Sequence, residues 1–124
     1  ATLLHGDAHA ENLPLDAEGE VVFLDWQAPR AGSPGFDLAV FTTMSYPPAE
    51  RRAVEEGLHE RHLRALRERG VEWAGSWEAY RRGVLRRAAR IVEIAAQDGL
   101  PSLDWLFERC AAAAVDHRAL ELVP

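Results

Sequence analysis

Short apolar runs in the first third of the chain and helical periodicity in the remainder divide the sequence into two parts. In residues 1–47 the apolar runs alternate with segments rich in Gly, Pro, Asp and His. In residues 48–124 apolar positions recur three and four residues apart among Ala, Arg, Glu and Leu, a pattern typical of amphipathic helices. No repeat or low-complexity linker separates the two parts, so we interpret residues 1–124 as a single domain.

A β-hairpin is predicted in the first part. Residues 13–15 and 21–24 favour strands and flank a polar, Gly-containing turn at residues 16–20. Pro14 weakens the first arm, because proline cannot donate to a ladder and prefers sheet edges. A Gly- and Pro-rich loop follows, and residues 36–46 then favour a buried helix.

Three further helices are predicted in the second part. Pro47 and Pro48 start the first one and Gly70 ends it. Ser76 and Ser102 are the expected N-caps of the other two. The middle helix carries an apolar stripe of Tyr80, Val84, Ala88, Ile91, Val92 and Ala95. The pattern therefore predicts a mainly α fold with a small β-hairpin.

Composition and charge narrow the possible partners. The chain is 48% hydrophobic and 27% charged, which is typical of globular proteins. A net charge of -6 counts against nucleic-acid binding, since that binding neutralises phosphates with basic residues. The longest apolar stretches are too short to span a bilayer, so we expect no membrane partner. The single cysteine, Cys110, excludes an intrachain disulfide and fits a reducing, cytoplasmic setting.

The densest group of reactive side chains lies in residues 5–12, with the sequence HGDAHAEN. Its pattern is His-x-Asp-x-x-x-x-Asn, and Asp25 follows the apolar run 21–24. Phosphoryl transfer uses one carboxylate to accept the proton of the attacking hydroxyl, and an acid and an amide oxygen to hold Mg²⁺. The spacing from Asp7 to Asn12 equals that of the kinase catalytic loop, and Asp25 stands where the metal-binding aspartate of kinases would follow.

Three segments carry a family resemblance: LHGDAHAEN, VVFLDWQ and GSPGFDLAVF. They resemble the catalytic core of the aminoglycoside phosphotransferase and choline kinase-like superfamily. The DWQ form, with the Arg- and Ala-rich helices that follow, most resembles the ecdysteroid-kinase-like branch. The resemblance covers most of the chain and implies the C-terminal lobe of a protein-kinase-like α+β fold, with the N-terminal nucleotide lobe absent.

The resemblance implies an ATP-dependent phosphotransferase that acts on a hydroxyl of a small molecule. Asp7 would be the catalytic base, and Asn12 and Asp25 would bind Mg²⁺. Residues 1–47 would supply the catalytic loop, the hairpin and the metal loop, and residues 48–124 the helical, acceptor-binding part. The sequence does not identify the acceptor alcohol or the residues that bind it.

Three further residues of the matching segments are expected to be structural. His5 would brace the catalytic loop, and Asp37 would anchor it by accepting backbone N–H bonds. His9 would play a structural or supporting role.

All 14 basic residues are arginines. Kinases of this fold use a lysine of the N-terminal lobe to hold the α- and β-phosphates, and an arginine is not an equivalent point charge. We therefore expect residues 1–124 alone to transfer no phosphate.

Two alternative functions remain open. The first is a metal-dependent phosphoesterase or hydrolase that would use His5, Asp7, His9 and Asp25 on a transition metal. The second is a non-catalytic, kinase-like binding module.

The remaining polar and aromatic residues are expected to have ordinary structural roles. Three histidines lie among charged helical residues and are predicted to be solvated: His59, His62 and His117. An arginine series on the middle helix is predicted to be a solvated surface rather than a site for an anionic substrate: Arg81, Arg82, Arg86, Arg87 and Arg90. Packing roles are predicted for Trp73, Trp77, Trp105 and Cys110.

Overall fold

The computed structural model of the chain describes residues 1–71, 73, 77–98 and 104–123. The described part is mainly helical, with a small two-stranded antiparallel sheet, which confirms the predicted fold class. In chain order the elements are β1 (Thr2–Leu4), the 3₁₀ helix η1 (Ala10–Asn12), β2 (Arg30–Gly32), α1 (Gly35–Ser45), α2 (Pro48–Glu68), α3 (Trp77–Asp98), α4 (Asp104–Asp116) and the 3₁₀ helix η3 (Ala119–Leu122).

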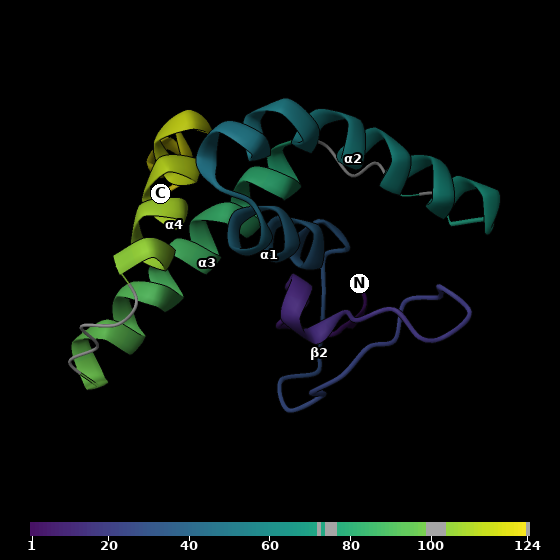
Figure 1. Cartoon of the computed structure of the whole chain (residues 1–124). Helices are drawn as coiled ribbons and strands as arrows, with labels where there is room; N and C mark the ends of the chain where they lie inside the picture. Colours follow the sequence, from purple (N-terminus) through teal and green to yellow (C-terminus); the bar gives the residue numbers. More distant parts are fainter. Residues whose placement is uncertain (72, 74–76, 99–103, 124) are drawn as a thin grey trace.

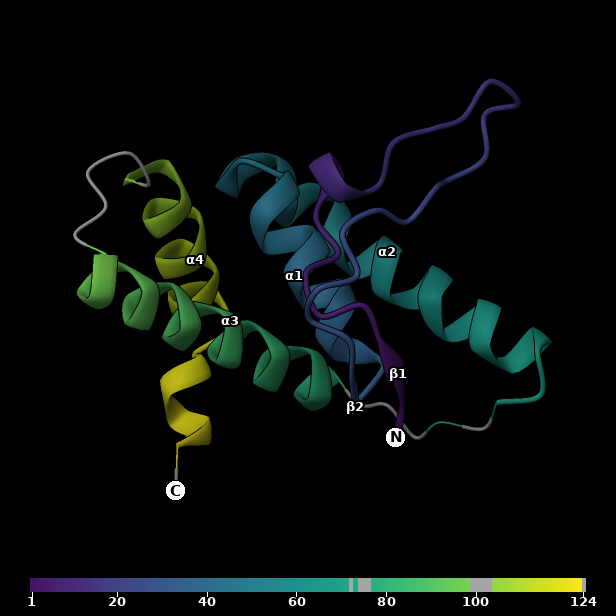
Figure 2. The same cartoon turned by 90° about the horizontal axis from the view of Figure 1, so that it is seen from below.

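The small sheet forms between segments far apart in the sequence. β1 pairs with β2 in antiparallel register, with Leu3 opposite Ala31. The predicted hairpin is present as a bridge between Leu15 and Val21, and it extends away from the helices (Figure 2). The sequence did not predict β2, because residues 30–32 lie in the Gly- and Pro-rich stretch that favoured a loop.

Helix α1 lies against α3, and both contribute to the hydrophobic core (Figure 1). Gly83 allows the close approach, because a Cβ at that position would lie 2.8 Å from the Cβ of Ala39. One buried cluster joins the sheet to the helices and contains Leu4, Phe36, Val40, Met44, Ile91, Leu106 and Cys110. A second cluster contains Ala39, Tyr80, Val84 and Ala113.

The predicted boundaries of α2 are confirmed. Pro48 occupies the first turn, where the missing N–H of proline costs no hydrogen bond. At the other end Gly70 has a positive φ of 72°, and the Val71 N–H donates to the Leu66 carbonyl. This is a Schellman termination, which glycine favours because it has no Cβ. The predicted caps Ser76 and Ser102 lie outside the described residues.

The apolar stripe of α3 is confirmed in part. Tyr80, Val84 and Ile91 are buried, whereas Val92 is exposed. Residue 92 lies one position along the helix from Ile91, and one position rotates a side chain by about 100°. The prediction that Val92 faces the core was therefore wrong. Among the described helices, none is long and apolar enough to cross a membrane.

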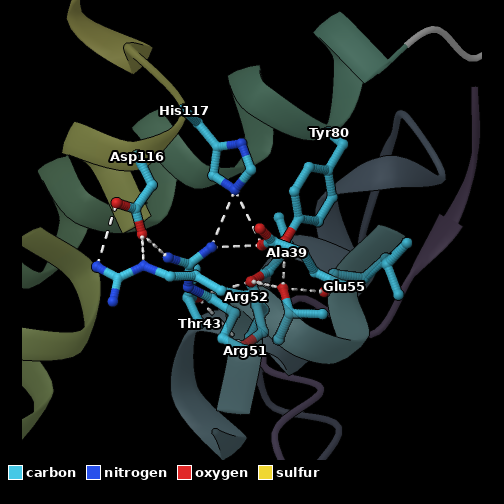
Figure 3. Close-up of polar contacts among 11 residues, drawn as sticks. Ala39, Thr43, Arg51, Arg52, Glu55, Tyr80, Asp116 and His117 are labelled. Carbon is cyan, nitrogen blue, oxygen red and sulfur yellow. Dashed lines mark hydrogen bonds and ion pairs between the residues drawn. The ribbon is translucent and has the colours of Figure 1, made fainter. Parts of the chain in front are cut away.

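A buried polar network holds α2, α3 and the end of α4 together (Figure 3). Arg51 of α2 is only 1% exposed and forms ion pairs with Glu55 and Asp116. The same Glu55 carboxylate accepts hydrogen bonds from His117 Nε2 at 2.9 Å and from the Tyr80 hydroxyl at 3.1 Å. One carboxylate oxygen thus connects three buried partners.

The network sets the charge state of its central acid. Burial by itself raises the pKa of Glu55, but hydrogen bonds from His117 and Arg51, together with their charges, outweigh burial and lower the pKa. Burial raises the pKa of Tyr80, whose hydroxyl also lies 2.6 Å from Thr42 Oγ1. Glu55 therefore stays ionised inside the protein while Tyr80 stays neutral.

The prediction that the helical histidines are solvated was wrong. His59 and His117 are buried, and His62 is half-buried. The rings of His59 and His117 both contact Trp77 edge-on. Glu60 and Arg118, which follow His59 and His117 in the sequence, are exposed, so the charged composition of these segments did not indicate the burial of the histidines.

Candidate active site

The loop that carries Asp7 is anchored to the start of α1. Asp37 lies in the first turn of α1, and its two carboxylate oxygens accept the His5 and Gly6 backbone N–H groups at 2.7 and 2.9 Å. Charge-assisted hydrogen bonds of this kind are short and strong. The position of the loop is therefore coupled to a buried helix.

His5 connects the same loop to the segment that leads into Asp25. The ring is buried, and its Nε2 lies 2.7 Å from the Leu24 carbonyl oxygen. Its Nδ1 accepts the Asp7 backbone N–H at 3.3 Å. Since a carbonyl can only accept, the ring carries its proton on Nε2 and is the neutral tautomer. Both ring nitrogens are thus engaged in holding the loop.

Gly6 permits a very close approach of a second segment. Its φ is +88°, and a Cβ built there would lie 2.2 Å from the Ala28 carbonyl oxygen. A residue with a side chain would be strained by the backbone angle and would also overlap this oxygen. Glycine is therefore required for the loop to lie directly against residue 28.

Asp7 is held between two elements. Its Oδ1 lies 3.2 Å from Arg87 Nη2 on α3, and its Oδ2 lies 3.5 Å from both His9 Nε2 and Asn12 Nδ2. The side chain keeps 25% of its surface exposed. The carboxylate is oriented by its neighbours and remains accessible from solvent.

The prediction that the arginines of the middle helix are all solvated was wrong for Arg87. It is only 8% exposed, and burial lowers its pKa while the Asp7 carboxylate raises it. Arg81 is also partly buried and donates to the His117 carbonyl at 2.7 Å. The spacing 80, 84, 87 and 91 places Arg87 on the apolar stripe of α3, so the sequence did contain a signal for its burial.

Asn12 is oriented by Asp7 and His9. Its Nδ2 donates to the Asp7 carbonyl at 3.0 Å and lies 3.2 Å from His9 Nε2. Its Oδ1 accepts no hydrogen bond from the described residues. The Asn12 carbonyl accepts the Leu24 N–H at 2.9 Å, so Asn12 lies beside the residue that precedes Asp25.

Asp25 adopts an unusual backbone conformation. Its φ is +60°, which side-chain-bearing residues adopt at a cost and which clusters at functional sites. The side chain is exposed, and its Oδ2 accepts a hydrogen bond from Gln27 Nε2 at 3.0 Å. Within the described part of the chain, no hydrogen bond joins the side chains of Asn12 and Asp25, although their backbones lie close together.

The oxygen donors of this site suit Mg²⁺. No group of three or more His, Cys, Asp or Glu side chains in the described ranges could hold a metal ion. Asn12 Oδ1 and the Asp25 carboxylate are hard oxygen donors, and Mg²⁺ is commonly bound through one or two carboxylates together with waters and substrate phosphates. The donor set therefore fits Mg²⁺ that is also bound by waters and substrate phosphates.

A cleft of about 680 Å³ opens beside Asp7. Its lining includes the loop residues Gln27 and Ala28 and residues of α3, among them Arg87. The cleft gives a small molecule room to approach the Asp7 carboxylate.

Comparison with known proteins identifies the family to which the chain belongs. The mainly helical fold is compatible with the C-terminal lobe of a kinase, and residues 1–70 match the model of the ecdysteroid kinase-like family. The chain belongs to this family, in agreement with the resemblance of its sequence motifs. The comparisons found no match among curated proteins and none among solved structures.

Proposed function

We propose that this chain is the catalytic part of an ATP-dependent kinase that phosphorylates a hydroxyl group of a small molecule. The observation that carries the proposal is the placement of Asp7, which lies at the edge of a cleft and is held by Arg87 and Asn12. Membership of a kinase-like family supports the same reaction class.

Asp7 is the proposed catalytic base. Its carboxylate accepts the proton of the acceptor hydroxyl, the hydroxyl oxygen attacks the γ-phosphorus of ATP, and ADP leaves. Arg87, at 3.2 Å, fixes the carboxylate and compensates its charge while the acceptor is absent. Asp37 and His5 position the loop through the contacts described above.

Asn12 and Asp25 are the residues proposed to hold Mg²⁺. The metal would neutralise charge on the transferring phosphates. Asn12 Oδ1 accepts no hydrogen bond from a described residue, and Asp25 has a positive φ; both features support these assignments. His9, which lies 3.2 Å from Asn12 Nδ2, would keep the amide turned so that Oδ1 faces away from Asp7.

We also propose that a nucleotide-binding lobe covers the hairpin. The second arm of the hairpin exposes the apolar side chains of Val21, Phe23 and Leu24, and Trp26 just beyond it is also exposed. Neighbouring exposed apolar side chains are typical of an interaction surface. The chain contains no lysine to hold ATP phosphates. In this proposal residues 1–124 alone transfer no phosphate, and the complete enzyme works in the cytoplasm, where the free thiol of Cys110 stays reduced.

The metal requirement of the full-length gene product tests this function. Asp25→Asn should raise the Mg²⁺ concentration needed for ATP-dependent turnover by at least about tenfold, because a direct ligand is weakened. Asp16→Asn is the matched control: its Oδ1 only accepts hairpin N–H groups, which an amide oxygen also accepts. An unchanged Mg²⁺ requirement in Asp25→Asn would refute the metal assignment.

The two alternative functions give different results in the same preparation. A metal-dependent hydrolase would retain Zn or Mn through purification, whereas the kinase would bind Mg²⁺ weakly and together with nucleotide. The engagement of both His5 ring nitrogens argues against the hydrolase, which needs this residue as a ligand. A non-catalytic module would show no ATP-dependent transfer even as the full-length protein.

A further inference from the structure

We propose that the acceptor alcohol of this kinase carries an anionic group, which binds to the arginines of the cleft beside Asp7. The inference rests on the proposed kinase function and specifies its substrate class: a small hydroxylated acid with a carboxylate, sulfate or phosphate group.

The cleft concentrates positive charge in an acidic protein. Its lining includes four arginines, Arg30, Arg86, Arg87 and Arg90, and only two acids, Asp7 and Glu93. The chain as a whole has a net charge of -6. Charges of one sign in a cleft focus the field and raise the local concentration of oppositely charged ligands. The cleft therefore attracts an anionic ligand even though the protein as a whole is negatively charged.

The pairing of these arginines leaves two of them without a counter-charge. Arg87 pairs with Asp7 at 3.2 Å, and Arg90 pairs with Glu93 at 3.3 Å. Neither Arg30 nor Arg86 forms an ion pair with a residue in the described ranges.

Both uncompensated arginines are oriented by the same aromatic ring. The guanidinium carbons of Arg30 and Arg86 lie 4.2 and 5.6 Å from the centroid of the Phe36 ring. Cation–π contacts of this kind stabilise a guanidinium without neutralising its charge. Both arginines therefore keep a positive charge that an anionic ligand could compensate.

Buried donors without partners provide a second observation. The Nε atoms of Arg30 and Arg87 are buried and donate to no partner among the described residues. Buried polar groups almost always have a hydrogen-bond partner, so each exception needs an explanation. Burial lowers the pKa of Arg87, and the nearby charges of Arg90 and Arg30 lower it further, against the opposing effect of Asp7. A bound anion in the cleft would offset this repulsion between neighbouring arginines.

The cleft lies on the acceptor side of Asp7. Its lining contains Asp7 but neither Asn12 nor Asp25, the residues proposed to hold the metal that accompanies the triphosphate. Phe36, Ala89 and Ile94 add an apolar section to the same lining. The site therefore suits a molecule with an apolar body, an anionic group for the arginines and a hydroxyl within reach of Asp7.

Three probes with one aromatic body test the charge preference. They are 4-(hydroxymethyl)benzoate, its neutral amide 4-(hydroxymethyl)benzamide, and the cation of 4-(aminomethyl)benzyl alcohol. Each is titrated into the chain and followed by the amide NMR signals of Gly6, Ala28 and Ala89. We expect the benzoate to bind at least about tenfold more tightly than the amide, and the cation to bind more weakly than both, because one charge-assisted hydrogen bond accounts for roughly this ratio.

Two arginine variants locate the binding. Arg86→Gln should reduce the preference for the benzoate several-fold, because Arg86 lines the cleft and forms no ion pair with a described residue. Arg82→Gln is the control: it lies one turn earlier on α3, is exposed, and bonds to Glu78 outside the cleft. Equal effects of the two variants, or equal binding of the three probes, would overturn the proposal. Absence of benzoate binding would overturn it as well.

Two further experiments distinguish a failure of this inference from a failure of the proposed kinase function. Mg·ATP titrated into the benzoate-saturated chain should leave the signals of Gly6 and Ala89 in place. Displacement of the benzoate would instead make the cleft a triphosphate site and refute the inference. Asp7→Asn should tighten benzoate binding, because it removes the acid that competes for Arg87. This binding result holds even if Asp7 proves dispensable for transfer, so failure of the kinase function would be recognised separately.

Discussion

Glu55 is the residue whose replacement tests the structural account most sharply. Its Oε2 accepts hydrogen bonds or ion pairs from Arg51, His117 and Tyr80, which come from three different parts of the chain. Glu55→Gln keeps the size and one acceptor oxygen but removes the charge. Among the described residues, the buried Arg51 then retains only Asp116 as a counter-charge.

The expected loss follows from the difference between charged and neutral hydrogen bonds. Each of the three contacts weakens by about 1 kcal/mol when the acceptor becomes neutral. The variant is spared the cost of burying a carboxylate, which offsets part of this loss. We therefore expect Glu55→Gln to lower the free energy of unfolding by about 2 to 3 kcal/mol, which shifts the melting temperature by roughly 10 °C.

Urea unfolding followed by tryptophan fluorescence measures this difference, with Glu56→Gln as the matched control. Glu56 is the next residue of α2, is exposed, and undergoes the same change of charge. A surface change of this kind should stay within about 0.5 kcal/mol of the parent. If Glu55→Gln and Glu56→Gln lower the free energy of unfolding by the same amount, the buried network does not hold the helices together and the reasoning is refuted.

Three further predictions concern pH, the loop and the thiol. Burial lowers the pKa of His59, so the folded state binds fewer protons than the unfolded state, and stability should fall as the pH drops from about 7 through 6. His59→Phe should reduce this pH dependence of stability in urea unfolding, and an unchanged pH dependence would contradict the burial of His59. Gly6→Ala should lower the free energy of unfolding by at least about 2 kcal/mol more than Gly19→Ala. Both positions have positive φ, but only at Gly6 would a Cβ lie within 2.2 Å of the Ala28 oxygen. Equal losses of stability in thermal unfolding would contradict the close contact between the two segments. Burial raises the pKa of the Cys110 thiol, so a disulfide reagent should label it only as fast as the protein unfolds, and rapid labelling of the native protein would show that the thiol is not buried.

The elements of this fold follow largely from local sequence signals. Proline at the start and Gly70 at the end define α2, because each has a backbone preference that operates without tertiary context. The strand β2 lacked such a signal. Residues 30–32 pair with β1 through long-range contacts, and a Gly- and Pro-rich composition carries no information about a distant partner.

The sequence motif indicates which residues belong to the candidate site, but it does not indicate the contacts that depend on how the helices pack. The motif predicts that Asp7 and Asn12 lie together, and Asn12 Nδ2 lies 3.5 Å from Asp7 Oδ2. The charged sequence neighbours of Arg87, in contrast, wrongly indicate a solvated side chain. Its pairing with Asp7 depends on how α3 packs against the loop. The burial of His117 was not predicted for the same reason, since its partner Glu55 lies on α2, far away in the sequence.

The central claim is that Asp7 accepts the proton of the acceptor hydroxyl during phosphoryl transfer. The most direct measurement is the rate of γ-phosphoryl transfer by the full-length gene product carrying Asp7→Asn, with nucleotide binding measured in the same preparation. Glu11→Gln, an exposed acid in η1 of the same loop, is the control. We predict that Asp7→Asn abolishes detectable transfer and still binds nucleotide, while Glu11→Gln keeps the parental rate. Transfer by Asp7→Asn at the parental rate would contradict the account.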